Sequence, residues 1–244
     1  MCAGTAASLA VNYLNFKDTE PEYAAESLKK AIALYDFAVE THSETEGNQV
    51  TSLGYDGGFY TSSYDYDELA WAAVWLYECT DNYDYIDDII HVDETVSGDM
   101  GAHPYTGYMK RIIADTGNCW QNIWVHCWDT VWGGVFAKLA PITNTARDWY
   151  IFRWNLEYWS GLDHVYPGAP DDQLWNTPYT ATDALNAPVI QSSTFLAKTP
   201  AGFSMLNNYG SCRYDTAAQL CALVYAKETG DTQFADWAEG QMEY

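Results

Sequence analysis

The residues with the clearest chemical potential in this chain are its aromatic side chains. The 244 residues include 11 Trp and 20 Tyr, and aromatic residues make up 16% of the sequence. Flat aromatic faces suit the C–H faces of sugar rings, and they suit the interior of packed helices equally well. Composition therefore leaves two interpretations open, a carbohydrate-binding surface and an aromatic helical core.

The charged residues narrow the range of partners. There are 34 acidic residues against 11 basic ones, for a formal net charge of -23. Nucleic-acid-binding proteins gather Lys and Arg on one face, so we expect no nucleic-acid partner, and for the same reason no membrane surface. No apolar stretch approaches the roughly 20 residues of a membrane span. A neutral ligand and a divalent cation are both compatible with this charge, although most of the acids are interpreted as solvated surface.

Three charged residues stand at the expected starts of helices. At Asp67 and Asp129 a carboxylate would complement the helix dipole, typically by about 0.3–1 kcal/mol. Arg213 is a basic residue that opens an apolar helix in an acidic chain, which makes an ordinary surface salt bridge the less favoured interpretation.

The cysteines and histidines show no pattern of metal ligation. The six cysteines form no CxxC pair and match no zinc spacing. Cys79, Cys212 and Cys221 lie in or beside apolar helical patterns, and most of the cysteines are interpreted as small buried hydrophobes. His126 and His164 are lone histidines, which are more often structural than catalytic.

The elements that must position these residues are helical. Apolar residues recur at spacings of three and four, which predicts helices over 1–16, 23–39, 67–79, 83–91, 129–140, 144–159, 213–228 and 232–244. Pro21 suits a first helical turn, Pro141 is expected to stop one helix, and Gly161 to end another. Residues 73–85 and 222–234 resemble each other weakly, since each reads as an apolar helix, a polar turn and a second helix. Repeated helical hairpins indicate a solenoid or a closed α/α toroid.

Several segments resemble glycoside hydrolase family 9 in the order typical of that family. They are 59–63 followed by 67–77, then 124–129, 155–161, 202–203, 209–214 and 237–244. The resemblance implies an all-α fold, the (α/α)6 barrel or toroid of helical hairpins. It also implies that residues 1–244 are the central part of a single catalytic domain, lacking its N-terminal and C-terminal portions, so that the barrel is incomplete.

The same resemblance implies an activity. Family members hydrolyse β-1,4-glucosidic bonds in cellulose and β-glucan as endo-β-1,4-glucanases, which makes β-1,4-glucan the expected partner. The implied mechanism inverts the sugar, with an acid and a base whose carboxyl groups stand roughly 6.5–9.5 Å apart. An extracellular location follows from the family, although the first residues lack the basic region of a secretion signal.

The family pattern assigns glucan-binding roles to five residues of this chain. They are Tyr60 near the cleavage point, Trp124 and Tyr209 as stacking aromatics, and the Arg213–Tyr214 pair. Tyr209 stands where the family usually has tryptophan, so its stacking should be weaker. For Tyr60 and Trp124 ordinary packing remains the alternative interpretation.

A calcium ion is the cofactor that the resemblance implies. The resemblance implies Ser63, Asp67, Glu68 and Asp129 as its ligands. Their side chains supply hard oxygen atoms, of which calcium takes roughly 6–8. The alternative is that the acids at helix starts serve only the helix dipole. The loop between Tyr60 and Asp67 is one residue shorter than the family form and lacks its tryptophan, which leaves the alignment of Ser63 open.

No catalytic residue is assigned to this chain. The family's Asp-Ala-Gly-Asp motif, which supplies the catalytic base, is not found in this sequence. The glutamate that acts as the general acid in the family normally follows the segment that ends here at Tyr244. Base and acid are therefore expected outside this chain, and the fragment alone is expected to be inactive. Glu157 is interpreted as a structural hydrogen-bonding residue. Two alternatives stay open, a non-catalytic glucan-binding module and a purely structural α/α toroid.

Overall fold

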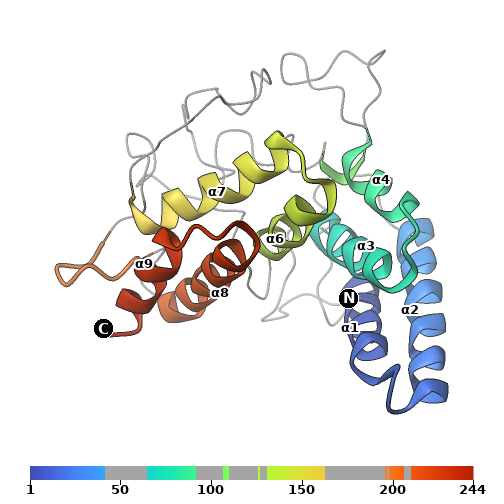
Figure 1. Ribbon diagram of the computed structural model, residues 1–244. Helices are drawn as coiled ribbons and strands as arrows, with labels where there is room; N and C mark the ends of the chain where they lie inside the picture. Colours follow the sequence, from blue (N-terminus) through green and yellow to red (C-terminus); the bar gives the residue numbers. More distant parts are fainter. Residues whose placement is uncertain are drawn as a thin grey trace, which may run out of the picture. The chain divides into compact units, whose positions relative to one another are not determined.

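The computed structural model describes residues 1–41, 65–91, 107–109, 126, 131–162, 196, 198–205 and 210–243 (Figure 1). They fall into two compact units, of which the first contains the described residues up to 91 together with 107–109. Within the described part of the chain the regular elements are helices, and the only β-type pairing is an isolated antiparallel bridge between Lys198 and Ser204. None of the described helices combines the length and the apolar character that crossing a bilayer requires.

The first unit is built from helices α1 (Cys2–Phe16), α2 (Pro21–Thr41), α3 (Tyr66–Thr80) and α4 (Asp84–Ile90). Helix α1 packs against α2 and α3, and α3 packs against α4. Figure 1 shows α1 and α2 side by side as a hairpin. These helices confirm the predictions over 1–16, 23–39, 67–79 and 83–91 to within a few residues.

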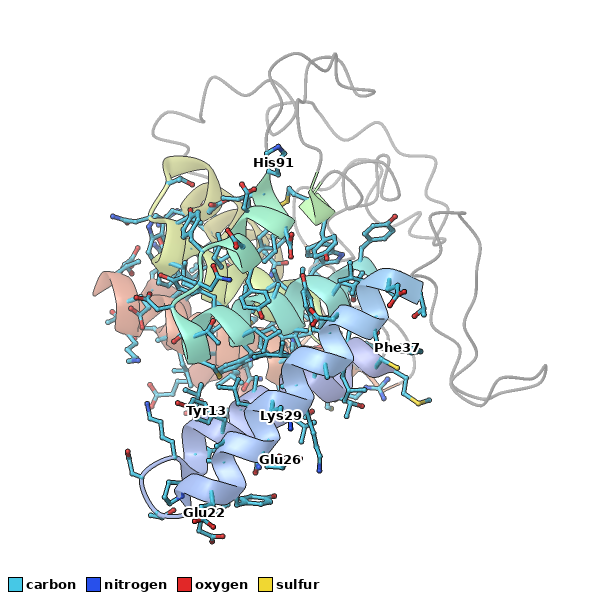
Figure 2. The ribbon with its side chains drawn as sticks, turned by 90° about the vertical axis from the view of Figure 1, so that its right-hand side faces the viewer. Tyr13, Glu22, Glu26, Lys29, Phe37 and His91 are labelled. Atoms are coloured by element: carbon cyan, nitrogen blue, oxygen red, sulfur yellow. The ribbon has the colours of Figure 1, made fainter. Side chains whose placement is uncertain are left out.

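Small residues let α1 and its neighbours approach closely. The buried positions of α1 are all alanines, Ala3, Ala6, Ala7 and Ala10. Two helices can pack at a short interaxial distance when the facing side chains are this small. The exposed side of α2 carries polar side chains, among them Glu22, Glu26 and Lys29 (Figure 2), together with the exposed Tyr23, Phe37 and Val39. Helix α2 thus buries one side, as its periodicity predicts, while its exposed side is mixed in polarity.

Helices α6 (Trp132–Thr143), α7 (Ala146–Ser160), α8 (Ser211–Thr229) and α9 (Gln233–Gln241) form the second unit. Helix α7 packs against α6, α8 and α9. The rings of Phe152 and Phe234 are fully buried, and each meets the ring of Tyr225 edge to face at 5.4 Å. Aromatic residues thus do build helical core in this unit, as one of the two interpretations of their abundance expected.

The expected stop at Pro141 is wrong, because α6 begins at Trp132 and continues through Pro141 to Thr143. Proline removes one backbone N–H, and this loss is tolerable so close to the end of a helix. The helix ends instead at Asn144, whose left-handed φ of 49° closes the last turn with a hydrogen bond from its N–H to the carbonyl of Ala140 at 2.9 Å. The side chain of Asn144 accepts a hydrogen bond from Trp149 Nε1 at 2.9 Å, which fixes this turn.

The start of α7 is held by a side-chain cap. Thr145 Oγ1 accepts the backbone N–H of Asp148 at 3.2 Å and donates to Asp148 Oδ2 at 2.8 Å. Asp148 is fully buried, so the cap also satisfies a carboxylate that water does not reach.

Removing this cap should destabilise the second unit. We expect Thr145→Ala to lower the free energy of unfolding by about 1–2 kcal/mol, the usual cost of a lost N-cap. Denaturant unfolding followed by circular dichroism measures the change. Thr216→Ala is the control, since this exposed threonine bonds only the carbonyl of Arg213 within its own helix. An equal loss in both variants would contradict the capping role.

The two echoing hairpins are closed by turns of the same construction. In the first unit, Thr80 Oγ1 donates to the carbonyl of Leu76 and accepts the N–H of Asn82, and Asn82 Oδ1 accepts the N–H of Asp84. In the second, Thr229, Asp231 and Gln233 repeat this arrangement, with Tyr225 supplying the carbonyl. The middle residue of each turn is left-handed, Asp81 with φ 56° and Gly230 with φ 77°. The echo in the sequence therefore corresponds to a repeated helical hairpin.

The cysteines differ from one another in environment. Cys221 is buried as predicted, and Cys79 is half-buried with its Sγ donating to the carbonyl of Ala10 at 3.3 Å. Cys212 is exposed and is thus an exception to the interpretation of most cysteines as buried hydrophobes. It lies in the first turn of α8, where the buried face is taken by Asp215.

Candidate functional site

The structure describes four of the predicted binding residues and places them in separate units. Asp67 and Glu68 lie in the first turn of α3, and Arg213 and Tyr214 in the first turn of α8. Tyr60, Ser63, Trp124, Asp129 and Tyr209 lie outside the described residues, as does His164. Their assigned roles remain predictions.

The Arg213–Tyr214 pair forms an exposed polar and aromatic surface at the start of α8. The guanidinium carbon of Arg213 lies 4.9 Å from the centre of the Tyr214 ring, and Arg213 Nη2 donates to Tyr214 Oη at 3.1 Å. Arg213 is exposed and Tyr214 is half-buried. The pair thus offers guanidinium donors and a phenol beside an aromatic ring.

The local sequence explains why this pair faces outward. Gly210 precedes α8 with φ 67°, a left-handed conformation that glycine adopts without steric cost. Asp215 is fully buried, and its carboxylate accepts a hydrogen bond from Gln219 one turn later. Residues two apart on an α-helix are separated by roughly 200° around its axis. Burying Asp215 therefore turns Arg213 toward solvent.

Asp67 and Glu68 form an acidic pair at the start of α3, in which Glu68 is half-buried. Asp67 is fully buried. Burial raises the pKa of Glu68, while a hydrogen bond with the Asp67 side chain acts in the opposite direction. Neighbouring Asp65 raises the pKa of Glu68 further. The carboxyl groups predicted as metal ligands are therefore brought together in a place of low solvent access.

These two residues fit part of a cation site. Two adjacent carboxyl groups away from water supply hard oxygen atoms, the donors that calcium prefers. Within the described residues no group of three or more His, Cys, Asp or Glu side chains is placed to hold a metal. The described part of the chain thus contributes the Asp67–Glu68 pair and no further ligand of these types.

The remaining acids and histidines of interest have structural partners. Glu157 Oε1 accepts a hydrogen bond from Arg153 Nε at 2.7 Å, which confirms its structural interpretation. His126 Nδ1 lies 3.3 Å from the carbonyl oxygen of Val131, so this nitrogen carries the proton. Burial lowers the pKa of His126 and favours the neutral ring.

A polar junction in the second unit was not predicted. The amine of Lys198 donates to the carbonyl of Trp159 at 2.6 Å, at the end of α7, and to Ser204 Oγ. The N–H of Ser204 donates to Gln241 Oε1 at 2.7 Å, at the end of α9. Burial lowers the pKa of Lys198 to about 8. The only signal in the sequence was a lysine among Pro and Gly, which predicts a turn but none of these partners.

Within the described residues the chain is an all-α protein built from repeated helical hairpins. The family model described as glycosyl hydrolase family 9 matches residues 1–244, and the chain belongs to that family. The expected fold class is confirmed, since the solved structures that it matches are family 9 cellulases of (α/α)6 barrel type.

Individual relatives show how much of a longer protein this chain matches. It is 27% identical over 234 residues to Endoglucanase 4 of Bacillus sp. (strain KSM-522), covering 96% of this chain and 29% of that protein. It is 39% identical over 87 residues to Endoglucanase 10 of Arabidopsis thaliana, covering 36% of this chain and 16% of that protein. The catalytic domain of Clostridium thermocellum CelT matches with a TM-score of 0.66 and 31% identity, over 100% of this chain and 42% of that one. The chain therefore spans less than half the length of these relatives.

Proposed function

We propose that this chain is part of a family 9 catalytic domain that hydrolyses β-1,4-glucosidic bonds in cellulose or β-glucan with inversion, and that it contributes part of the glucan-binding surface. The observation that carries the proposal is the exposed Arg213–Tyr214 pair on a chain that belongs to this family. An extracellular location belongs to the same proposal, because polymeric cellulose is an extracellular substrate.

The chemistry of the pair suits a glucan. A guanidinium has five N–H donors in a planar arrangement, and Arg213 Nη2 donates to Tyr214 Oη. Guanidinium N–H groups can donate to sugar hydroxyl groups, while the tyrosine ring offers a flat face to the C–H side of a glucose unit. Hydrogen bonds that involve a charged group contribute roughly 1.5–3 kcal/mol each.

Titration with cello-oligosaccharides in a calorimeter tests this role. We expect Arg213→Ala to weaken binding by about tenfold or more, since losing about 1.4 kcal/mol costs a factor of ten in Kd. Lys227→Ala is the matched control, because this exposed cation lies in the last turn of the same helix and pairs only with neighbouring Glu228. Unchanged binding by Arg213→Ala, or equal weakening by both variants, would refute the role of Arg213.

A second measurement separates catalysis from binding. Incubation with a soluble cellulose derivative measures turnover, and NMR of the first product shows whether the anomeric carbon is inverted. Binding without turnover is the expected result for this chain, which has no assigned acid or base. Turnover by this chain would place those groups within it. Absence of affinity for any glucan would favour a purely structural α/α toroid.

We further propose that Asp67 and Glu68, with Ser63 as a sequence-predicted ligand, bind a calcium ion at the start of α3. The support is the full burial of Asp67, the partial burial of Glu68 and the hydrogen bond between their side chains. A bound divalent cation would compensate the negative charge there and hold the first turn of α3 in place. Asp129 remains a ligand predicted from the sequence alone.

Calcium should therefore stabilise the folded chain. At a free concentration one hundred times Kd, a single site adds about 2.7 kcal/mol, which a thermal melt records as a higher Tm than in EDTA. We expect Asp67→Asn and Glu68→Gln to abolish most of this increment. Glu22→Gln is the control, because Glu22 is also an acid in a first helical turn but is exposed (Figure 2). Loss of the increment in the control, or its absence in the wild-type chain, would count against the site.

A further inference from the structure

Three side chains from separate segments of the first unit form a partly buried hydrogen-bonded chain, in which Tyr35 is buried, Tyr108 half-buried and Asp88 exposed. Tyr35 of α2 is 3% exposed, and its Oη donates to Asp88 Oδ2 of α4 at 2.7 Å. Tyr108 Oη lies 2.9 Å from Tyr35 Oη. A phenol has one proton, and that of Tyr35 is directed to the carboxylate, so Tyr108 donates to Tyr35. Burial raises the pKa of both phenols, that of Tyr108 to about 12, which keeps both protonated as donors.

Gly107 allows the segment that carries Tyr108 to dock on α4. A Cβ at residue 107 would lie 2.6 Å from the carbonyl oxygens of Asp88 and Ile89. The backbone of Gly107 therefore runs directly against the last turn of α4, and its N–H points to the carbonyl of His91 at 3.4 Å. Met109, next to Tyr108, is fully buried. Tyr108 is thus held on both sides as well as at its hydroxyl.

The ring of Tyr108 meets the start of α3. It contacts the ring of Tyr66 edge to face, with centroids 6.2 Å apart and planes at 61°. Tyr66 is the first residue of α3 and is followed directly by Asp67 and Glu68. The preceding Asp65 gives α3 no side-chain cap. The ring contact between Tyr108 and Tyr66 therefore holds the first turn of α3, which has no side-chain N-cap.

We propose that Tyr108, fixed by Tyr35 and Asp88, is a positioning residue that orients the first turn of α3 and so holds the Asp67 and Glu68 carboxyl groups in a cation-binding arrangement. This inference rests on the calcium proposal above. Outer residues that orient the ligands of a metal typically change its affinity by about 10–100-fold when they are replaced. Tyr108 does not contact the ligands itself but acts through Tyr66, so its replacement should change the calcium affinity by an amount near the lower end of that range.

The test is calcium affinity, measured by calorimetry on the intact chain, together with Tm in calcium and in EDTA. We expect Tyr108→Leu, which removes both the ring contact and the hydrogen bond, to weaken calcium binding by about tenfold. Tyr108→Phe keeps the ring contact and should lose less. If Tyr108 has a purely structural role, its replacement lowers Tm by the same amount in calcium and in EDTA. If Tyr108 positions the calcium ligands, its replacement also reduces the difference between the Tm in calcium and the Tm in EDTA.

The matched control lies at the other end of the same helix. Tyr83 meets Tyr77 of α3 edge to face at 6.1 Å, so Tyr83→Leu removes a comparable ring contact far from Asp67. We expect wild-type calcium affinity from this variant. If Tyr108→Leu does not fold, Tyr35→Phe replaces it, since it breaks both hydrogen bonds of the chain and keeps the ring.

The outcomes distinguish the two proposals. A wild-type chain that binds no calcium overturns the cation site and the positioning role with it. A wild-type chain that binds calcium, together with a Tyr108→Leu variant that binds it equally well, overturns the positioning role alone. Weakened binding in Tyr108→Leu and unchanged binding in Tyr83→Leu support both.

Discussion

An Arg153→Leu variant is expected to lose about 3 kcal/mol of unfolding free energy, because it removes the partner of a buried carboxylate. Arg153 Nε donates to Glu157 Oε1 at 2.7 Å, and the Glu157 side chain is 1% exposed. A buried ion pair contributes little compared with an apolar pair of the same shape. Deleting one member is costly nonetheless, since it leaves the other charge away from water.

The other contacts of Arg153 add to this loss. Its Nη1 donates to Asp231 Oδ2 and to Tyr225 Oη, both at 3.1 Å. Its guanidinium carbon lies 5.3 Å from the centre of the Phe234 ring. Arg153 of α7 therefore contacts Tyr225 of α8, Asp231 in the turn after α8, and the buried ring of Phe234 in α9.

Thermal unfolding measures the effect of Arg153→Leu. For a chain of this size each kcal/mol lowers Tm by roughly 2–4 °C, so a fall of roughly 6–12 °C is expected. Lys30→Leu is the matched control, since Lys30 and Glu26 form an ion pair of the same spacing with side chains 63% and 54% exposed. Pairs of that kind contribute roughly 0–1 kcal/mol. A similar fall in both variants would show that burial of Glu157 is not the cause.

A Gly107→Ala variant is expected to lose about 3 kcal/mol, at the upper end of the cost of overpacking. The added methyl would lie 2.6 Å from the carbonyl oxygens of Asp88 and Ile89 and 2.7 Å from the carbonyl carbon of Ile89. Backbone atoms cannot rotate away as a flexible side chain can. Either α4 or residues 107–109 must shift, and the hydrogen bonds of Tyr108 would weaken with them.

Gly4→Ala is the control for this substitution. Gly4 lies within α1, and a Cβ there meets nothing within 4 Å. Alanine is favoured over glycine inside a helix by roughly 0.5–1 kcal/mol, so this variant should be more stable than the wild type. Denaturant unfolding compares the two. Destabilisation by Gly4→Ala, or wild-type stability of Gly107→Ala, would contradict the expected packing.

The helices could be predicted from the sequence because their signals are local. Periodic apolar residues indicate α2 and α3. Gly161 ends α7 in the left-handed conformation, with φ 71°, that glycine commonly adopts at the end of a helix. Pro141 shows the limit of such signals, since the same residue type can end a helix or be tolerated near its end. Trp71 and Trp75 lie one helical turn apart in the sequence, but only the structure shows that their rings meet edge to face, with centroids 5.3 Å apart and planes at 84°.

The candidate site could be predicted only in part, because its supporting contacts join distant residues. The motif around 209–214 predicts the Arg213–Tyr214 pair, but nothing local shows that a buried Asp215 orients it. Tyr35 reaches Asp88 across 53 positions and Tyr108 across 73. Tertiary packing determines such contacts. No sequence pattern around either residue predicts which distant residue it will contact.

The paired turns after α3 and α8 have a consequence for how this chain folds. Each is closed by hydrogen bonds between residues at most four positions apart, so each hairpin can form its turn before any distant contact exists. Structures dominated by contacts close in sequence fold faster than those that need distant pairings, because little chain entropy is lost in closing a short loop. These turns are therefore natural starting points for folding in the two units, and the links that Arg153 and Tyr108 make across longer stretches of sequence would form later.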